Sequence, residues 1–384
     1  MNKTEQEVFY SLLKSALWQQ EPDLSTLQQP GWQWDTVLQV LERHAVLGLV
    51  IDTILSLPES LQPAAQQTAR LMQFAAANAK THRKLCRAIL EVTQQMDAAG
   101  IPTVLLKGEG LVPYYPQRCI RSCGDIDLYI GPEHYETAKS VFLAQCTPEE
   151  AATAEESEVE HHLGVQHWDL IYELHRYAGM AGDPKYQTVY LQRSGQYLQP
   201  GQCPQTQLSD GSEVCTPPMQ FNAWYIFNHI IQHFREGGIG IRQFCDWARV
   251  LYAATAPDAP TPLDQDKLRQ DLQTVGLYRP WRVLGGILVR QLGYPQERFP
   301  FYSPCLARQS QGLVLRMLTS GQNFHFGGLD ESYRTEQHGL HRLTSALRYF
   351  TTSTLPLFPI SPGMAYRAFL RYIRFGVNGL RARH

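Results

Sequence analysis

Apolar residues recur every three or four positions over the first hundred residues of the chain. Val8 and Leu12 belong to this pattern, which brings apolar side chains onto one face of a helix. The last helix of the region is predicted over 63–99, because Gly100 and then Pro102 follow it and together form a common helix stop. The N-terminal part of the chain is therefore predicted to be helical.

After Gly100 the pattern becomes that of an α/β segment. Short apolar or alternating runs predict strands at 103–106, 125–130, 161–168 and 170–176. Helical spacing between them predicts a helix at 133–145. Two less regular stretches follow, 177–199 and the Gly/Pro-rich 200–218, which we interpret as strand and loop extensions of the same sheet.

Helical spacing returns at Pro217 and continues toward the C-terminus. Helices are predicted at 219–234, 239–254, 263–275, 279–292, 340–350 and 363–380. The predicted fold class is α+β, with a small mixed β-sheet core flanked by N-terminal and C-terminal helical regions. We place the N-terminal helical region at 1–84, the α/β core at 85–216 and the C-terminal helical domain at 217–384.

Composition narrows the class of protein. The chain has 384 residues, with 34 Lys and Arg against 36 Asp and Glu, and its 18% of charged residues lies below the roughly 25% that is usual. This balance excludes a generic polyanion-binding protein, so no stable nucleic-acid partner is expected. The 43% of apolar residues is that of a folded globular protein.

The sequence favours the cytoplasm. Its first twenty residues alternate polar and apolar positions and lack the apolar core of a signal peptide. The most apolar stretches, 44–57 and 281–292, are shorter than the ~20 residues that span a bilayer. The eight cysteines are scattered without a CxxC pair, which is typical of a reducing compartment.

Two aspartates in one predicted strand are the strongest chemical signal. Residues i and i+2 of a strand point to the same face, so Asp125 and Asp127 are expected to direct both carboxylates one way. Two like charges at this spacing need a positive partner. Mg²⁺ suits them, because it takes one or two protein carboxylates and completes its shell with substrate phosphates. Two metal ions about 3.5–4 Å apart would activate an attacking oxygen and stabilise a leaving one.

Neighbouring segments add to this candidate site. The strand at 103–106 runs into Lys107 and Gly108, a permissive turn whose backbone amides, together with the lysine charge, suit a phosphate. The strand at 170–176 carries Glu173, which would become a third carboxylate beside the pair if the two strands are neighbours.

These residues resemble a known family. The order Lys-Gly, Arg, Asp-Ile-Asp-Leu and then acid-Leu-His is similar to the nucleotidyltransferase domain of the DNA polymerase β-like superfamily. More closely, it resembles the bacterial family of uncharacterised nucleotidyltransferases. The segments 228–234 and 241–246 are similar to that family's helical His segment and its Arg…Asp segment, so the resemblance covers about residues 85–255.

The resemblance implies an enzyme that moves a nucleoside monophosphate from an NTP to an acceptor hydroxyl or phosphate and releases pyrophosphate. Asp125 and Asp127 would bind Mg²⁺ (or Mn²⁺), with Glu173 as the third carboxylate and catalytic residue. Gly108 would be the glycine of the phosphate turn. The wider superfamily favours Gly-Ser or Gly-Gly there, whereas this chain has Glu109, so the usual hydroxyl is absent. The alternative is a catalytically inactive nucleotide-binding or scaffold protein with the same fold.

Several side chains have two interpretations. Arg121 either binds a phosphate with its planar fork or forms a structural ion pair. For the helical segment we favour a buried hydrogen-bond network of His233, Arg242 and Asp246 over a zinc site at His229 and His233. His175 orients Glu173, touches substrate or simply packs at the strand end.

Two charged segments complete the analysis. The acidic stretch 147–160 is interpreted as a solvated connection, with electrostatic gating of the site as the alternative. The last predicted helix is basic and amphipathic, and we favour its docking on the body of the protein over contact with an anionic membrane surface or nucleic acid. Its basic residues are Arg367, Arg371, Arg374, Arg381 and Arg383.

Overall fold

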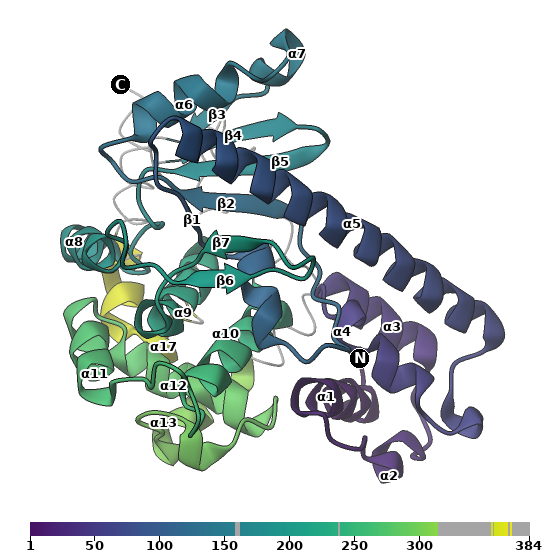
Figure 1. Cartoon of the computed structure of the whole chain (residues 1–384). Coiled ribbons are helices and arrows are strands. Elements are labelled where there is room, and N and C mark those ends of the chain that lie inside the picture. The colour runs from purple at the N-terminus through teal and green to yellow at the C-terminus, as the bar shows by residue number, and fades with distance from the viewer. Residues whose placement is uncertain (158–161, 237–238, 314–354, 356, 368, 371–384) are drawn as a thin grey trace, which may run out of the picture.

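The computed structural model describes residues 1–157, 162–236, 239–313, 355, 357–367 and 369–370. Within them a five-stranded sheet lies at one end of the molecule, and two groups of helices lie at the other (Figure 1). This arrangement confirms the predicted α+β class with a small mixed sheet and flanking helices. Among the described helices, none combines the length and the hydropathy that crossing a bilayer requires.

The N-terminal helices follow the predicted spacing. They are α1 (Lys3–Trp18), α2 (Leu24–Leu27), α3 (Trp34–Arg43), α4 (Leu47–Leu55), the 3₁₀ turn η1 (Glu59–Leu61) and α5 (Ala65–Ala98). Helix α1 begins with a capping box, in which Asn2 and Glu5 each accept the other's backbone N–H. Helix α5 ends just before Gly100, whose φ of +73° needs a glycine. It runs from the N-terminal helices to the sheet (Figure 1).

The five-stranded sheet is mixed. Its strands are β1 (Val104–Leu105), β2 (Asp125–Tyr129), β3 (Glu155–Ser157), β4 (His162–His167) and β5 (Leu170–His175), in the order β1-β2-β5-β4-β3. Only the central pair of β2 and β5 is parallel among these neighbours. The 3₁₀ helix η2 (Gly108–Tyr114) follows β1, and α6 (Tyr135–Leu143) and α7 (Pro148–Ala151) connect β2 to β3. The four predicted strands and the helix predicted over 133–145 are thereby confirmed.

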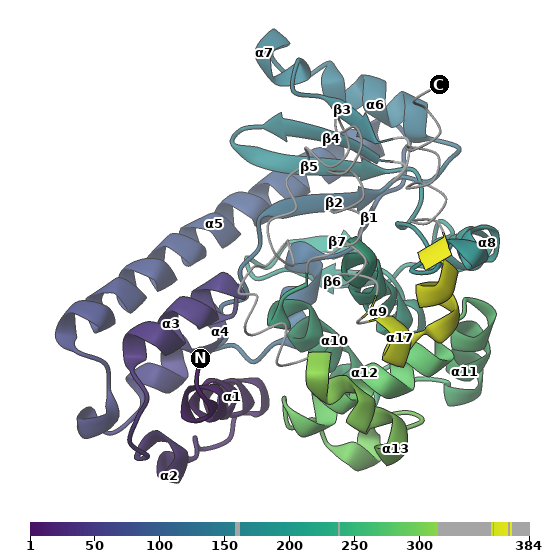
Figure 2. The same ribbon diagram turned by 180° about the vertical axis from the view of Figure 1, so that it is seen from behind.

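Helices α5 and α6 cover one face of this sheet. Ile126, Leu128 and Leu174 point into a buried cluster with Ile89 of α5 and Phe142 of α6. Because successive side chains of a strand alternate, the odd-numbered residues of β2 and β5 lie on the opposite face. Figure 2 shows the sheet from that side, with α5 behind the strands.

Two predictions for the segment after the sheet were wrong. Residues 187–197 form helix α8 (Gln187–Tyr197), after a 3₁₀ turn η3 (Pro184–Tyr186), and are not a strand extension. The helix forms because Tyr190, Ser194 and Tyr197 lie on one face and are buried together. Strands β6 (Gln205–Gln207) and β7 (Glu213–Cys215) form a separate two-stranded sheet and do not extend the larger one.

The acidic stretch is more ordered than the predicted connection. It contains α7 and the edge strand β3, which pairs with β4. Lys139 of α6 lies 2.5 Å from Glu156 and compensates part of its charge. Residues 158–161 of this stretch lie outside the described residues.

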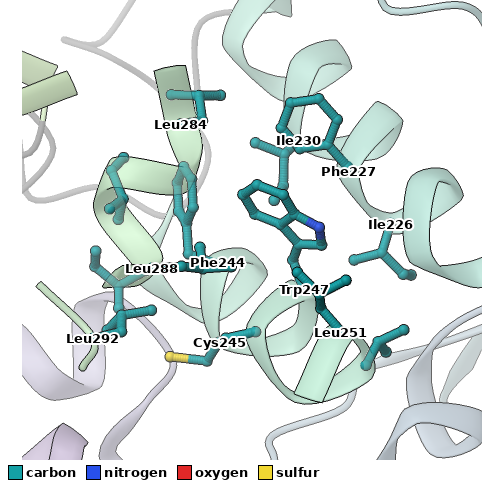
Figure 3. Close-up of a cluster of buried hydrophobic side chains, with 14 of the residues drawn as sticks. Ile226, Phe227, Ile230, Phe244, Cys245, Trp247, Leu251, Leu284, Leu288 and Leu292 are labelled. Carbon is teal, nitrogen blue, oxygen red and sulfur yellow. The ribbon is translucent and has the colours of Figure 1, made fainter. Parts of the chain in front are cut away.

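The C-terminal helices pack around aromatic side chains. They are α9 (Met219–Glu236), α10 (Ile241–Ala254), α11 (Gln265–Thr274), α12 (Tyr278–Arg290), η4 (Gln296–Arg298), α13 (Pro304–Ala307), η5 (Arg308–Ser310) and α17 (Leu357–Ile360). Figure 3 shows the centre of this packing, where the rings of Trp247 and Phe227 lie 4.5 Å apart. The four helices predicted between 219 and 292 are confirmed.

The two remaining predicted helices fall partly or wholly outside the described residues. The helix predicted at 340–350 lies entirely outside them. Of 363–380, the residues 363–367 and 369–370 are described and helical. Arg367 forms an ion pair with Asp183 near the start of η3, which is a contact with the body of the protein. The other arginines of the predicted basic helix lie outside the described residues.

The N-terminal and C-terminal helices share one hydrophobic core. A single buried cluster includes Phe9 of α1 and Trp247 of α10. The indole N–H of Trp18 donates to the carbonyl of Leu292 at 2.5 Å, and Arg249 donates to that of Leu17 at 2.8 Å. The sheet is thus carried on a helical base that is built from both ends of the chain.

Candidate functional site

The parallel pairing of β2 and β5 builds the centre of the site. Its register places Asp127 beside Glu173, Asp125 beside Ile171 and Tyr129 beside His175. The carboxylates predicted from the sequence thus come from adjacent strands and share the sheet face opposite to α5. Asp127 is 1% exposed, whereas Asp125, at the start of β2, is exposed.

Two cationic side chains contact these carboxylates. Lys107 Nζ lies 2.9 Å from Asp127 Oδ1. His175 Nε2 lies 3.0 Å from the same oxygen and 3.2 Å from Glu173 Oε2. His175 therefore bridges two of the three acids, and one of the predicted roles, orienting Glu173, is compatible with this geometry.

For His175, Glu173 and Lys107, burial disfavours the charged form, whereas the neighbouring opposite charges favour it. Burial works against a charged His175, but its hydrogen bonds to Asp127 and Glu173 outweigh burial and raise the pKa of the imidazole to about 9. For Glu173, burial also works against the charge, yet the hydrogen bond and charge of His175 lower the pKa of the carboxyl to about 2. Burial likewise opposes a charged Lys107, and the charge of Asp127 nevertheless keeps the pKa of the amine well above its usual value. Both carboxylates therefore face protonated partners near neutral pH.

The donor set fits a divalent cation. Asp127 Oδ2 is buried and has no hydrogen-bond partner among the described residues, so one of its oxygens is available to a ligand. Ligand atoms of His162, Glu173 and His175 lie within 4.8 Å of one another. Carboxylate oxygens on adjacent strands are the donors that Mg²⁺ and Mn²⁺ prefer. Asp127 and Glu173, with Asp125 two residues from Asp127 on the same face, are the residues that could hold such a metal; of these three, only Glu173 is in the group of ligand atoms within 4.8 Å of one another.

The turn before these strands is shaped by Gly108. Its φ of +59° lies in the left-handed region, and a Cβ there would meet the carbonyl oxygen of Asp125 at 3.2 Å. The glycine thus lets the turn approach the start of β2 closely. The 3₁₀ helix η2 begins at Gly108 itself.

The carboxylate of Glu109 is bound to α5. Glu109 is 1% exposed, and its Oε1 lies 2.6 Å from His82 Nδ1. Its Oε2 accepts a longer hydrogen bond, of 3.8 Å, from the thiol of Cys86. Glu109, which stands where the wider superfamily has serine or glycine, therefore directs its carboxylate toward α5.

Arg121 forms a buried structural ion pair. Its Nε and Nη2 donate to the two carboxylate oxygens of Asp246 at 2.7 and 2.9 Å. Tyr115 also donates to Asp246 Oδ1, at 2.7 Å. Arg121 is 5% exposed, so of its two interpretations the ion pair describes the structure.

The predicted network of His233, Arg242 and Asp246 needs a correction. In the described part of the chain, the hydrogen bonds that reach Asp246 come from Arg121 and Tyr115. Arg242 donates instead to the carbonyl of Ser122 at 2.9 Å. His233 Nε2 lies 2.9 Å from His229 Nε2. The reason is that the segment before β2 packs against α10 and brings Arg121 to Asp246. Helical spacing within α9 and α10 does not reveal this partner.

Sequence reasoning missed two histidines of this region. His162 of β4 pairs with His175, and their ring centroids lie 5.1 Å apart. The short gap between the strands predicted at 161–168 and 170–176, which favours a hairpin, was the signal that could have found it. His82 contacts Glu109 from the middle of α5, and no local pattern distinguishes it from other polar residues of that helix.

Comparisons with known proteins identify the family of the chain. The sequence model of the family described as uncharacterised nucleotidyltransferase matches residues 30–289, which is more than half of the chain and includes the three carboxylates, Arg121 and Asp246. Searches of curated proteins and of solved structures give no match. The extent of the family match and the residues that it includes show that this chain belongs to the uncharacterised nucleotidyltransferases, a family of transferases.

Proposed function

We propose that the protein transfers a nucleoside monophosphate from an NTP to an acceptor hydroxyl or phosphate, with release of pyrophosphate, in a reaction that depends on Mg²⁺ or Mn²⁺. The observation that carries the proposal is the register of β2 and β5. It sets Asp127 beside Glu173, with Asp125 two residues away on the same face. Family membership supports nucleotidyl transfer in general.

The carboxylates have separate roles in this proposal. Asp125 and Asp127 hold the divalent metal, and Asp127 does so through Oδ2, the oxygen without a protein partner among the described residues. Glu173 completes the acidic set and accepts the proton of the acceptor hydroxyl or binds metal. The bound cation supplies positive charge to the triphosphate and lowers the pKa of the attacking oxygen.

The two cations that contact Asp127 keep the acidic site folded before substrate arrives. Without Lys107 and His175, the neighbouring carboxylates of Asp127 and Glu173 would repel each other at a site that is largely shielded from solvent. In this proposal the Lys107 amine also binds phosphate oxygens at the turn, since Lys107 directly precedes Gly108. His175 fixes the orientation of Glu173 through the 3.2 Å contact.

Glu109 has two consequences for this proposal. Its carboxylate is bound by His82, which reduces the repulsion that a free acid would exert on a phosphate. Because Glu109 stands in place of serine, the turn also lacks the hydroxyl that the wider superfamily uses. The second point favours the alternative, a protein of the same fold that binds nucleotide without turnover and serves as a scaffold.

A binding experiment tests the site first. Thermal unfolding is measured with each of the four NTPs and Mg²⁺ or Mn²⁺, for the wild type and for the double variant Asp125→Asn/Asp127→Asn. Asp169→Asn is the matched control, because Asp169 lies exposed in the turn between β4 and β5, where Asn tolerates the positive φ of 53°. We expect metal-dependent stabilisation in the wild type and the control and its loss in the double variant.

A turnover experiment then separates the two functions. NTP labelled at the α-phosphate is incubated with the wild type and with protein, tRNA and small-molecule fractions of a cell extract, and label transfer and pyrophosphate are followed. Transfer that the double variant lacks supports the enzyme. Nucleotide binding without pyrophosphate release in any fraction would favour the scaffold, and stabilisation that persists in the double variant would refute the assignment of the carboxylates.

A further inference from the structure

A second group of metal-ligating side chains lies beneath the phosphate turn. We call it the His82 cluster, and it consists of His82 and Cys86 of α5, Glu109 of η2 and Cys123 just before β2. One nitrogen, one carboxylate oxygen and one sulfur, from His82, Glu109 and Cys123, lie within 4.8 Å of one another. We propose that the His82 cluster is a Zn²⁺ site, separate from the carboxylates of β2 and β5.

The positions of the donor atoms suit a tetrahedral ion. In such a site, with metal–ligand distances of about 2.0–2.3 Å, neighbouring ligand atoms are roughly 3.3–3.8 Å apart. His82 Nδ1 and Glu109 Oε1 are now 2.6 Å apart, so they would separate by roughly 1 Å to admit the ion. Cys86 Sγ lies 3.8 Å from Glu109 Oε2 but outside the group of ligand atoms within 4.8 Å of one another, so the fourth position of the ion is left to a water molecule.

The chemistry of the donors selects zinc over magnesium. A thiolate, an imidazole and a carboxylate form a borderline-soft set that Zn²⁺ binds, whereas Mg²⁺ requires oxygen ligands. Arg121 Nη1 donates to Cys123 Sγ at 2.8 Å, but burial outweighs this contact and raises the pKa of the thiol to about 12, so the thiol is protonated before a metal ion binds. Metal binding displaces the thiol proton of Cys123 to solvent, and the ion then shares the negative charge of Glu109.

A similar triad elsewhere in the chain shows what the His82 cluster has in addition. Cys146, Glu150 and His167 also lie within ligand range of one another. There, however, the carboxylate of Glu150 accepts backbone N–H groups from Thr147 and Trp168 at 2.9 and 3.0 Å, besides its contact with His167. Metal binding would break those bonds. Glu109 has side-chain partners only from the cluster itself among the bonds described, so its oxygens can turn to a metal.

Zinc at this position would connect three segments of the chain. At the cluster, the polar contacts between helix α5 and the turn at Gly108 are one short hydrogen bond and one longer thiol contact, whereas Cys123, in the residues leading into β2, is bonded to Arg121 of its own segment. A metal ion would replace these with coordinate bonds. The site would therefore stabilise the base of the nucleotidyltransferase site, and it does not depend on whether that site is active.

Metal content and a spectroscopic probe test the proposal on the full chain. Protein expressed with zinc and dialysed is analysed by mass spectrometry for bound metal, and the metal-free form is titrated with Co²⁺. We expect one zinc per chain and a near-ultraviolet band of thiolate-to-cobalt charge transfer. Cys123→Ser should remove most of the band, and His82→Ala should weaken zinc binding by at least about tenfold. The matched control Cys146→Ser should change neither.

Measurements on the wild type alone can refute the proposal, so the test does not depend on whether the variants fold. Wild-type protein that holds no zinc after reconstitution and shows no charge-transfer band has no site of this kind. Equal zinc content in the wild type and in both cluster variants would also overturn it. The variant Asp125→Asn/Asp127→Asn should keep its zinc while losing metal-dependent NTP binding, which distinguishes a failure of this proposal from a failure of the proposed function.

Discussion

Replacing Asp246 with asparagine should destabilise the protein strongly without any contact between Asp246 and substrate. The carboxylate accepts two bonds from Arg121 and one from Tyr115, and Arg121 is 5% exposed. Asparagine has nearly the same shape but no charge, and its NH₂ group would face a donor. The guanidinium would then be buried without a counter-charge.

The magnitude follows from this burial. Removing one partner of a buried ion pair costs about 3–5 kcal/mol, because the remaining charge stays desolvated. An exposed pair gives the comparison: Arg118 and Asp52 lie 3.4 Å apart with 77% and 50% of their side chains exposed. Such pairs contribute about 0–1 kcal/mol. We therefore expect Asp246→Asn to lower the free energy of unfolding by several times more than Asp52→Asn.

A double-mutant cycle measured by urea unfolding provides the assay. Arg121→Met and Asp246→Leu each leave one buried group unpaired, whereas the double variant removes both charges. The double variant should therefore be less destabilised than the sum of the single variants, by about 2 kcal/mol or more. Far-ultraviolet circular dichroism follows the unfolding, and equal slopes against urea show that the unfolded states are comparable.

One result would refute this reasoning. If Asp246→Asn changed the free energy of unfolding by less than about 1 kcal/mol, the pair would behave like an exposed one. If Arg121→Met left stability unchanged and abolished NTP binding, the guanidinium would act on a phosphate, which is the other interpretation of the sequence.

Two further predictions concern the turn and the N-terminal core. Gly108→Ala should cost about 1–2 kcal/mol of stability in urea unfolding, because a φ of +59° is strained for alanine and its Cβ would press on Asp125; an unchanged midpoint would show that the turn adapts freely. Burial and the charge of Arg43 lower the pKa of His44 to about 4. The unfolded state therefore binds more protons between pH 6.5 and 4, and stability falls as the pH drops through this range. The loss should be smaller by up to about 3 kcal/mol in His44→Gln, and equal pH profiles for the two proteins would contradict the assignment.

Much of the local structure was predictable from the sequence. Helix α5, the strands β4 and β5, and the helices between 219 and 292 follow from apolar spacing, since that spacing determines which face a segment can bury. The same alternation correctly put Asp125 and Asp127 on one face of β2. Helix α8 was missed even though Tyr190, Ser194 and Tyr197 have helical spacing, because glycine and polar residues interrupt the pattern.

Tertiary structure decided the contacts between distant segments. The parallel register that brings Glu173 to Asp127, the choice of Asp246 as the partner of Arg121, and the contact of Glu109 with His82 join residues 27 to 125 positions apart. Residue spacing reports on neighbours within a turn of helix or a strand, whereas these contacts arise from strand order and helix packing. The sequence by itself therefore identified the carboxylates and the family. Which charges neutralise the acids, and which side chain Glu109 binds, depended on how the helical base and the sheet pack together.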